Sequence, residues 1–189
     1  MEASDEQLML AYQGGDAGAF ETLYARHRGA LFRFMLRSIK ERGTAEELFQ
    51  EVWMRVIEAR VRYAPQARFT TWLYTIAHHR MVDHWRRRGL SLVSLDEDDP
   101  ATEPVASPVY EPQRQAESRQ DFGRLLAALE ALPAAQREAF LLHEEAGLSL
   151  AEIAAATGTN DETAKSRLRY ALAKLRAALA EEGEKARSG

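Results

Sequence analysis

The chain of 189 residues contains no cysteine, which excludes a disulfide framework, a thiolate zinc site and a cysteine nucleophile. Glycine and proline are scarce, with 11 and 6 residues, and 46% of the residues are hydrophobic. That composition excludes collagen-like, low-complexity and wholly disordered chains. No apolar run approaches the ~18 residues of a membrane span, and the first residues do not resemble a signal peptide. We therefore expect a cytoplasmic protein without membrane insertion.

Motifs of common enzyme classes are also missing. The sequence has no P-loop, no glycine-rich dinucleotide motif, no nucleophile elbow and no HExxH pair. His79 and Asp83 are i,i+4 neighbours and, with His78 or His84, have the spacing of a metal site. On a basic helix such residues are more often surface residues. We expect no catalytic residue, no cofactor and no metal.

Charge is distributed unevenly along the chain. Residues 1–90 carry 14 Lys and Arg against 11 Asp and Glu, whereas residues 91–121 carry 2 against 8. Residues 122–189 carry 9 against 10, yet the stretch 163–176 holds five cations and no acid. Two basic patches around an acidic connector fit nucleic-acid binding, because the local density of cations, not the net charge of −4, decides contact with phosphates.

Apolar residues recur with helical spacing through most of the chain, and no β-alternation of useful length occurs. Thr44 is the expected N-cap of one helix, because Glu47 completes a capping box with it. This helix ends before the break near Tyr63. The other predicted helices span residues 5–13, 16–39, 70–88, 117–132, 134–146, 149–157 and 161–181.

Residues 91–116 interrupt the helical pattern. Four prolines and the acidic run 96–99 favour a solvated linker in this stretch. We therefore predict an all-α fold of two small helical domains, residues 1–90 and 117–182, joined by a flexible acidic linker. Residues 183–189 are predicted to be a tail.

The strongest local signal lies in the C-terminal part. Ser149 and Glu152 have capping-box spacing at the start of a short helix. Gly158 is placed to end that helix, and Thr159 or Asn160 to cap the longer basic helix that follows. A short helix, a glycine-containing turn and a longer basic helix describe a helix-turn-helix, whose second helix enters the major groove of DNA.

The second helix of this motif has two faces. The face around Leu168 is apolar and is expected to be buried. The opposite face offers hydrogen bonds to base edges and cations to phosphates. Its candidate DNA-binding residues are Thr163, Lys165, Ser166, Arg167, Arg169 and Tyr170. An amphipathic helix with a solvated charged face is the alternative, which the preceding capped helix and turn disfavour.

The segment 68–88 interleaves aromatic and cationic side chains. Aromatic rings stack on unpaired bases and arginines follow the backbone, so this combination fits single-stranded nucleic acid. The alternative places Trp72, Leu73 and Ile76 in a core and leaves the terminal arginines as a solvated helix end favoured by the helix dipole.

In their order, these segments resemble a bacterial RNA polymerase sigma factor of the extracytoplasmic-function (ECF) branch, the compact form with only sigma regions two and four. The resemblance rests on TAEELFQEVW (44–53), on the aromatic and basic pattern of 69–88, on LPAAQREAF (132–140) and on TAKSRL (163–168). It covers nearly all of residues 5–180. The joint occurrence is highly specific, whereas a helix-turn-helix alone equally suggests a one-component regulator.

The resemblance implies roles for three sets of residues. The helix from Thr44 would bind the clamp helices of core RNA polymerase through residues on its exposed face, namely Glu47, Gln50, Glu51 and Met54. The loop 62–71 and the following helix would melt the promoter and read the minus-ten element, where a base is flipped into a pocket. The candidate residues there are Arg68, Phe69, Thr71, Trp72, His79, Arg80, Arg86, Arg87 and Arg88. The basic helix after the turn would read the minus-thirty-five duplex.

Three positions depart from the family's usual pattern. His79 stands where the family often has Asn, Tyr170 where it usually has Arg, and Thr159 where the turn usually has an apolar residue. These departures bear on the promoter sequence and not on the class of protein.

The sequence therefore predicts a dissociable promoter-specificity subunit that catalyses no reaction and is a monomer when free. The expected partners are core RNA polymerase (its clamp helices and flap), promoter DNA, and the anti-sigma factor with which the family usually pairs. A regulator that binds duplex operators without polymerase is the alternative, although it has no need for the segment 69–88. An enzyme with an unusual site is a second alternative, which a metal or nucleotide binding assay would expose.

Overall fold

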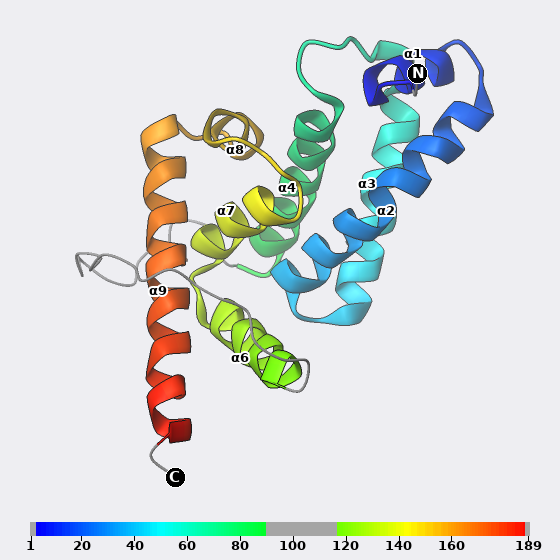
Figure 1. Cartoon of the computed structure of the whole chain (residues 1–189). Helices are drawn as coiled ribbons and strands as arrows, with labels where there is room; N and C mark the ends of the chain where they lie inside the picture. The colour runs from blue at the N-terminus through cyan, green and yellow to red at the C-terminus, as the bar shows by residue number, and fades with distance from the viewer. Residues whose placement is uncertain (1–2, 90–116, 188–189) are drawn as a thin grey trace.

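The computed structural model describes residues 3–89 and 117–187, and within these ranges every regular element is a helix (Figure 1). The predicted all-α fold with two domains is confirmed. We call residues 3–89 the N-terminal domain and residues 117–187 the C-terminal domain. The predicted linker at 91–116 lies outside the described residues.

The N-terminal domain contains four α-helices and a short 3-10 helix. These are α1 (Asp5–Gln13), α2 (Ala17–Ile39), α3 (Arg42–Ala59), η1 (Arg60–Arg62) and α4 (Phe69–Arg87). Ser4 caps α1 in a capping box with Gln7, and the Asp16 side chain accepts from the first amides of α2. Leu23, Leu31 and Leu73 are fully buried between the helices.

The start of α3 differs from the prediction. The helix begins at Arg42, and Glu41, not Thr44, is its N-cap. The Glu41 carboxylate accepts hydrogen bonds from the amides of Gly43 and Thr44, each with an N···O distance of 2.9 Å. A carboxylate at this position satisfies two unpaired donors and interacts favourably with the helix dipole, and this favours the earlier start.

The C-terminal domain contains α6 (Glu117–Ala131), α7 (Ala134–Glu144), α8 (Leu150–Thr157) and α9 (Asp161–Arg187). The predicted capping box of Ser149 and Glu152 is confirmed at the start of α8. Gly158 ends α8 with a left-handed φ of 65°, which only glycine adopts at low cost. Asn160 then caps α9, because its side-chain oxygen accepts from the Thr163 amide at 2.8 Å.

Helix α9 continues to Arg187, beyond the predicted end at residue 181. The residues after Leu179 are mainly Ala, Glu and Lys, which are strong helix formers, so the helix extends into the predicted tail. Nothing in the composition of this segment opposes helix except Gly183, whose cost is about 1 kcal/mol.

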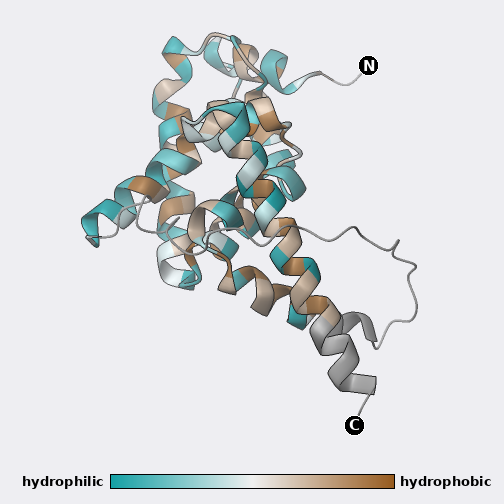
Figure 2. Cartoon of the chain, turned by 90° about the vertical axis from the view of Figure 1, so that its left-hand side faces the viewer, coloured by the Kyte–Doolittle hydropathy of each residue, from teal (hydrophilic) through white to brown (hydrophobic). Residues whose placement is uncertain are grey.

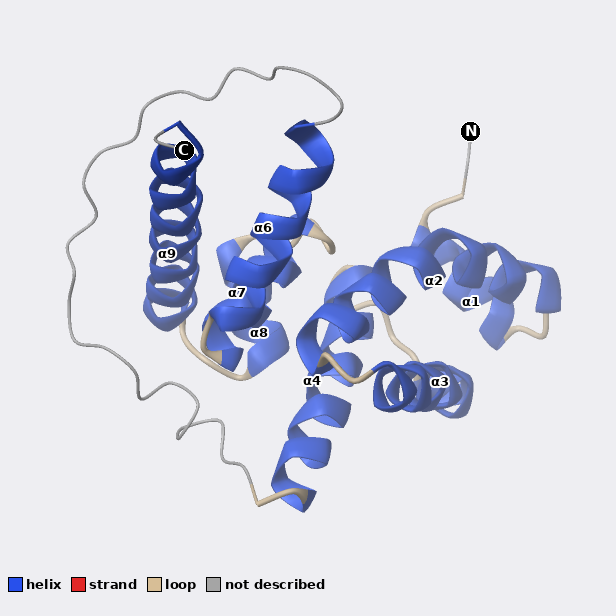
Figure 3. Ribbon diagram, turned by 90° about the horizontal axis from the view of Figure 1, so that it is seen from below, coloured by secondary structure: helices blue, strands red, loops and turns tan. Residues whose placement is uncertain are grey.

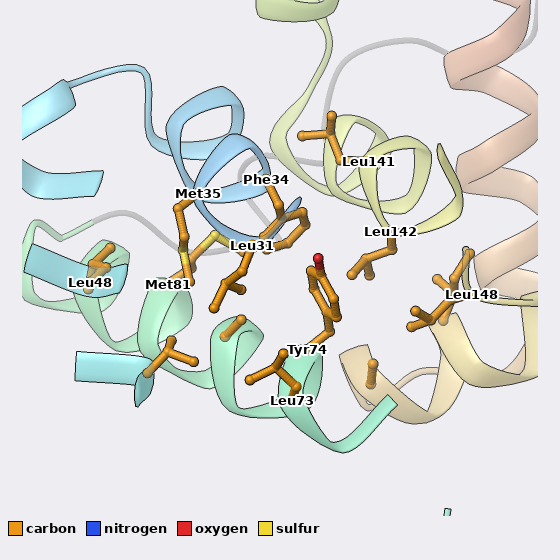
Figure 4. Close-up of a cluster of buried hydrophobic side chains, with 14 of the residues drawn as sticks. Leu31, Phe34, Met35, Leu48, Leu73, Tyr74, Met81, Leu141, Leu142 and Leu148 are labelled. Carbon is orange, nitrogen blue, oxygen red and sulfur yellow. The ribbon is translucent and has the colours of Figure 1, made fainter. Parts of the chain in front are cut away.

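The two domains pack against each other, with α4 against α8 and α2 against α7. Figure 3 shows α4 on the side of the N-terminal domain that faces α7 and α8. Tyr74 of α4 lies between Phe34 of α2 and Leu142 of α7 (Figure 4), and the rings of Phe34 and Tyr74 meet edge to face with centroids 5.1 Å apart. Buried apolar side chains therefore form one cluster that runs through both domains. Hydrophilic and hydrophobic residues are interspersed along the helices (Figure 2), as expected for helices that bury one face.

Candidate nucleic-acid interface

The exposed face of α9 carries the residues predicted to read duplex DNA. Lys165 and Arg169 are exposed, and Thr163, Ser166, Arg167 and Tyr170 are half-buried. On the opposite side Ala164, Leu168 and Ala171 are between 0% and 8% exposed. The predicted division of this helix into an apolar and a polar face is confirmed, and the polar face is open to solvent.

The hydrogen bonds on this face limit what each side chain can offer. The Ser166 hydroxyl donates to the Glu162 carbonyl at 2.7 Å, so it can only accept from a further partner. The Arg169 guanidinium lies over the Tyr170 ring, 5.0 Å from its centroid. This contact holds the Arg169 side chain at the surface. Its outward N–H groups can still donate to a base or a phosphate.

The first turn of α4 holds the residues predicted to melt DNA, but several of them are buried. Phe69 is 0% exposed and Thr71 is 5% exposed. The half-buried Trp72 packs edge to face against Tyr63 and at a tilt against Phe69, with ring centroids 5.0 and 5.8 Å away. Phe69 therefore cannot touch DNA in this conformation, and Trp72 is the aromatic residue of this set nearest the surface.

Glu152 of α8 covers the start of α4. Its carboxylate accepts a hydrogen bond from the Thr71 hydroxyl at 3.0 Å and lies 3.3 Å from the Arg68 guanidinium. The same carboxylate accepts from the Ser149 amide, and this hydrogen bond, the largest cause, lowers the pKa of Glu152. A carboxylate of the C-terminal domain thus contacts Arg68 and Thr71, two residues that were predicted to contact DNA.

The second half of α4 is basic and largely open. Arg86, Arg87 and Arg88 are exposed, whereas Arg80 is paired with Asp83 at 2.8 Å. Desolvation by neighbouring groups, followed by the charge of His78, lowers the pKa of His79. The lowered pKa favours the neutral form of the His79 ring, which can offer a hydrogen bond to DNA.

A groove of about 900 Å³ runs between α3 and α4. Its α3 wall contains the residues predicted to bind polymerase, namely Glu47, Gln50, Glu51 and Met54, and its α4 wall contains Arg80, Arg86 and Arg87. Met54, which also lines the α3 wall, is 55% exposed. The fold therefore brings together two residue sets that the sequence assigned to different partners. We refer to this feature as the α3–α4 groove.

The predicted metal-like spacing around His79 does not form a cluster. Among residues 3–89 and 117–187, no three His, Asp or Glu side chains are arranged to hold a metal ion. His78 instead points to Glu138 of α7, with its Nδ1 atom 2.7 Å from the carboxylate. In the same described ranges, no helix has both the length and the hydropathy to cross a membrane.

Sequence reasoning missed a group of charged residues that lie between the domains, namely His78, Arg137, Glu138 and Glu145. Arg137 and Glu138 are 7% and 2% exposed, although each belongs to a motif quoted for the family resemblance. The only signal in the sequence is that these charges fall among apolar residues of α7, as in Ala135, Ala139 and Leu142. Such a pattern indicates a helix buried on more than one face.

Two family models match the chain, one to each domain. Residues 23–90 match sigma-70 region 2, and residues 122–175 match sigma-70 region 4. The chain is 35% identical to the RNA polymerase sigma factor CarQ of Myxococcus xanthus, over 92% of this chain and 96% of the relative. It is 32% identical to the ECF RNA polymerase sigma factor SigE of Mycolicibacterium smegmatis, over 95% of this chain and 71% of the relative.

Solved structures with a similar fold include CnrH in complex with the cytosolic domain of CnrY. The TM-score is 0.67 and the identity 25%, over 95% of this chain and 99% of CnrH. The sigma factor RpoE of Bartonella quintana, in complex with the anti-sigma factor NepR, has a TM-score of 0.64 and is 24% identical, over 85% of this chain and 96% of RpoE. At 24% identity, the similarity to RpoE shows a shared fold and nothing further.

Proposed function

Because the chain belongs to the ECF branch of the RNA polymerase sigma factors and functions in promoter-specific transcription initiation, we propose how its surfaces divide that work. Helix α9 reads the upstream duplex, α4 contacts the downstream element and the melted strand, and the α3–α4 groove binds polymerase. The single observation that carries this proposal is the two-sided α9. Its apolar face is packed into the domain, while its basic face, which has no acid between residues 163 and 176, is open to solvent.

Reading of the upstream duplex is assigned to the first three turns of α9. The candidate residues there are the exposed Lys165 and Arg169 and the half-buried Thr163, Ser166, Arg167 and Tyr170. Arg169 is the candidate for a bidentate contact with guanine, and Lys165 for phosphates, because arginine presents a planar pair of donors and lysine a point charge. Tyr170 lies beside Arg169 and is suited to contact a thymine methyl group.

Contact with the downstream element is assigned to α4. Trp72 offers a ring at the surface for base stacking, and Arg86, Arg87 and Arg88 provide an exposed cationic end for the backbone. Phe69 acts indirectly in this proposal, because its buried ring supports Trp72. The energy for opening comes from capture of single-stranded bases, so we propose that the chain catalyses no reaction of its own.

Binding of the polymerase clamp helices is assigned to the α3–α4 groove. Its acidic α3 wall, with the exposed Met54 between carboxylates, suits a partner helix that offers basic and apolar side chains. In the C-terminal domain, Phe122 and Leu179 are 50% and 38% exposed on the packed pair α6 and α9. We assign the polymerase flap to these two helices for that reason.

An anti-sigma factor is the further proposed partner. The support is the family's usual pairing with such a factor, together with CnrH, a 25% identical fold neighbour that was solved in complex with the cytosolic domain of CnrY. Co-purification with core polymerase and a run-off transcription assay test the central proposal. We expect a stable complex and discrete transcripts from cognate promoters. Binding of duplex DNA without any association with polymerase would favour the operator-binding regulator instead.

A further inference from the structure

Helix α1 contacts both ends of the segment that joins α3 to α4. We call this segment, residues 60–68, the α3–α4 loop, and it includes η1. Helix α1 packs on α2 and also contacts η1 and α4 (Figure 1). Within the loop only Tyr63 is buried. Because water can satisfy an exposed backbone in many conformations, such a loop needs side chains from other elements to hold a single one.

Gln13, in the last turn of α1, holds the first half of the loop. Its side-chain Nε2 atom donates to the carbonyl oxygens of Arg60, Val61 and Tyr63, at 2.9, 3.1 and 3.1 Å. Three carbonyls around one nitrogen fix the orientation of this amide, because its oxygen atom cannot donate to them. The Arg60 guanidinium also lies over the Tyr12 ring, 5.1 Å from its centroid. The last turn of α1 thus fixes the backbone of η1 and of Tyr63.

Glu6, in the first turn of α1, holds the other end of the loop. Its carboxylate accepts a hydrogen bond from the Phe69 amide at 2.7 Å. The N-cap residue of α4 makes no side-chain capping hydrogen bond, so the acceptor for this first amide comes from α1. Asp5, the neighbour of Glu6, contacts Arg26 and His27 of α2 at 2.8 and 2.7 Å. The first turn of α1 is therefore anchored on α2 while it holds the start of α4.

The ring of Tyr63 connects the loop to Trp72. The two rings meet edge to face, with centroids 5.0 Å apart. On its other side, Trp72 contacts Phe69, whose amide is held by Glu6. The hydrogen bonds of Gln13 and Glu6 therefore act on the two residues that support the Trp72 ring, which is the ring proposed to stack on a base.

We propose that α1 is a brace that holds the α3–α4 loop in the conformation that captures the melted strand, with Gln13 and Glu6 as its positioning residues. A loop that is already ordered loses less conformational entropy when it binds single-stranded DNA. A larger part of the binding free energy is then available to open the duplex. This inference rests on the proposed role of the loop and of Trp72 in opening.

Substitution at Gln13 separates the hydrogen-bond donor from the bulk of the side chain. Gln13→Met keeps a side chain of similar length but has no donor, whereas Gln13→Lys restores a group with three donors. Thr22→Val is the matched control. It removes a hydrogen bond of the same domain, from the Thr22 hydroxyl to the Gly18 carbonyl at 3.0 Å, and this bond does not involve the loop.

The absence of cysteine allows one spin label to report on the loop in the full chain. The label is attached to a cysteine at the exposed Ala64, and a separate chain labelled at the exposed Ala177 of α9 reports general loosening. We expect Gln13→Met to increase nanosecond mobility at position 64 alone, and Gln13→Lys and Thr22→Val to keep the mobility of the parent. Unchanged mobility at position 64 in Gln13→Met, or an equal increase at both positions, would overturn the proposal.

Transcription by the chain reconstituted with core polymerase measures the effect on opening. At saturating holoenzyme a duplex promoter has to be opened, whereas the same promoter with a pre-melted segment does not. We expect Gln13→Met to lower transcription from the duplex about fivefold, the effect of about one hydrogen bond, and from the pre-melted promoter less than about twofold. Gln13→Lys should restore transcription from the duplex, and Thr22→Val should change neither. If Gln13→Lys is as impaired as Gln13→Met, position 13 does not act as a donor and the proposal is wrong.

The Glu6 end gives an independent test in the same assays. Glu6→Met removes the acceptor of the Phe69 amide, whereas Glu6→Gln retains one. We expect Glu6→Met to resemble Gln13→Met and Glu6→Gln to resemble the parent in the ratio of duplex to pre-melted transcription. Equal defects of the two Glu6 variants would show that the hydrogen bond to α4 does not position the loop.

Trp72→Ala tests the proposed function separately. A duplex-specific defect of Trp72→Ala, together with parental mobility and transcription in Gln13→Met, would leave the proposed function intact and overturn the brace. Equal losses of Gln13→Met on the two templates would reduce α1 to a contribution to stability and would also overturn it. A looser loop without any change in transcription would refute the role of the loop in opening, and the inference with it.

Discussion

At the scale of single residues, the contact between Arg169 and Tyr170 bears on whether Arg169 reads a base or binds a phosphate. The guanidinium lies 5.0 Å from the ring centroid, and Arg169 is exposed opposite the buried Leu168. Stacking limits the rotamers of Arg169 and so reduces the entropy that a contact with a base would cost.

We expect Arg169→Ala to relax the preference at one base pair of the upstream element, because a bidentate contact with guanine contributes about 1–3 kcal/mol of discrimination. Lys174→Ala, farther along α9, should weaken binding to all sequences equally. Selection of a promoter library with each variant measures both effects. If Arg169→Ala lowers affinity while every positional preference persists, Arg169 binds phosphate and the assignment is wrong.

Glu6 links α1 to the start of α4. Its carboxylate accepts a hydrogen bond from the Phe69 amide at 2.7 Å, and this bond, the largest cause, lowers the pKa of Glu6. A carboxyl group with a lowered pKa in the folded state stabilises the fold above its unfolded pKa of about 4.3. That stabilisation is lost as the pH falls through the folded-state pKa.

We therefore expect Glu6→Gln to destabilise the chain at pH 7 by less than about 1 kcal/mol, because the site is partly solvated and Gln still accepts a hydrogen bond. The difference from the parent should shrink as the pH falls below about 4. Urea unfolding of the parent and of Glu6→Gln, at pH 7 and below pH 4, measures the difference in the free energy of unfolding. A difference that is constant between pH 7 and acid would show that the charge of Glu6 has no part in stability.

At the scale of elements, α3 is a helix with one face in the core and one in the α3–α4 groove. Leu48, Val52 and Val56 are 0–2% exposed, while Glu47 and Gln50 line the groove. The two faces are independent, so a change in the groove should affect binding without affecting the fold.

We expect Glu47→Ala/Gln50→Ala to weaken binding to core polymerase and to change the free energy of unfolding by no more than about 0.5 kcal/mol. Glu46→Ala is the control, because Glu46 pairs with Arg42 and does not line the groove. Competition against a second sigma factor measures the affinity. Affinity equal to that of the parent would refute the assignment of the groove.

Helix α4 has two ends with different expected roles. Replacement of Arg86, Arg87 and Arg88 by Ala should weaken binding to all promoters alike and make the salt dependence of binding shallower, because phosphate contacts are lost.

Trp72→Ala should impair transcription from duplex promoters more than from pre-melted ones, because only duplex promoters have to be opened. Phe69→Ala is unsuitable for this comparison, since its ring is fully buried and its loss costs about 3–5 kcal/mol of stability. Equal defects of Trp72→Ala on both templates would show that Trp72 does not act in melting.

At the scale of the whole molecule, the sequence predicted the helices and the helix-turn-helix because their signals are local. Ser149, Glu152 and Gly158 act within one turn, and each was placed correctly. The start of α3 was misplaced because two competing caps, Glu41 and Thr44, lie three residues apart, and the choice between them depends on the preceding turn.

The contact between the two domains could not be predicted by the same reasoning. His78 and Glu138 are 60 residues apart, and each alone has the character of a surface residue. The burial of Phe69 was missed for a related reason, since only the position of α1 and α2 decides whether an aromatic residue at a helix start packs inward. Residues that bridge elements distant in sequence have no local signature, whereas residues that form one element do.

The buried His78–Glu138 pair gives the last prediction, because it tests whether the domains stabilise each other. Glu138→Leu alone leaves the His78 ring without its partner in a buried site, and His78→Leu alone leaves a carboxylate there. We expect both single variants to lower the free energy of unfolding, and the double variant His78→Leu/Glu138→Leu to lose less than their sum by about 1–3 kcal/mol. Denaturant unfolding of the four chains completes the cycle. Additive losses would mean that the two side chains are not coupled in solution. The packing of the two domains would then depend on the apolar contact of Tyr74 with Leu142 and on the ion pairs of Glu145 and Glu152 with arginines of the N-terminal domain.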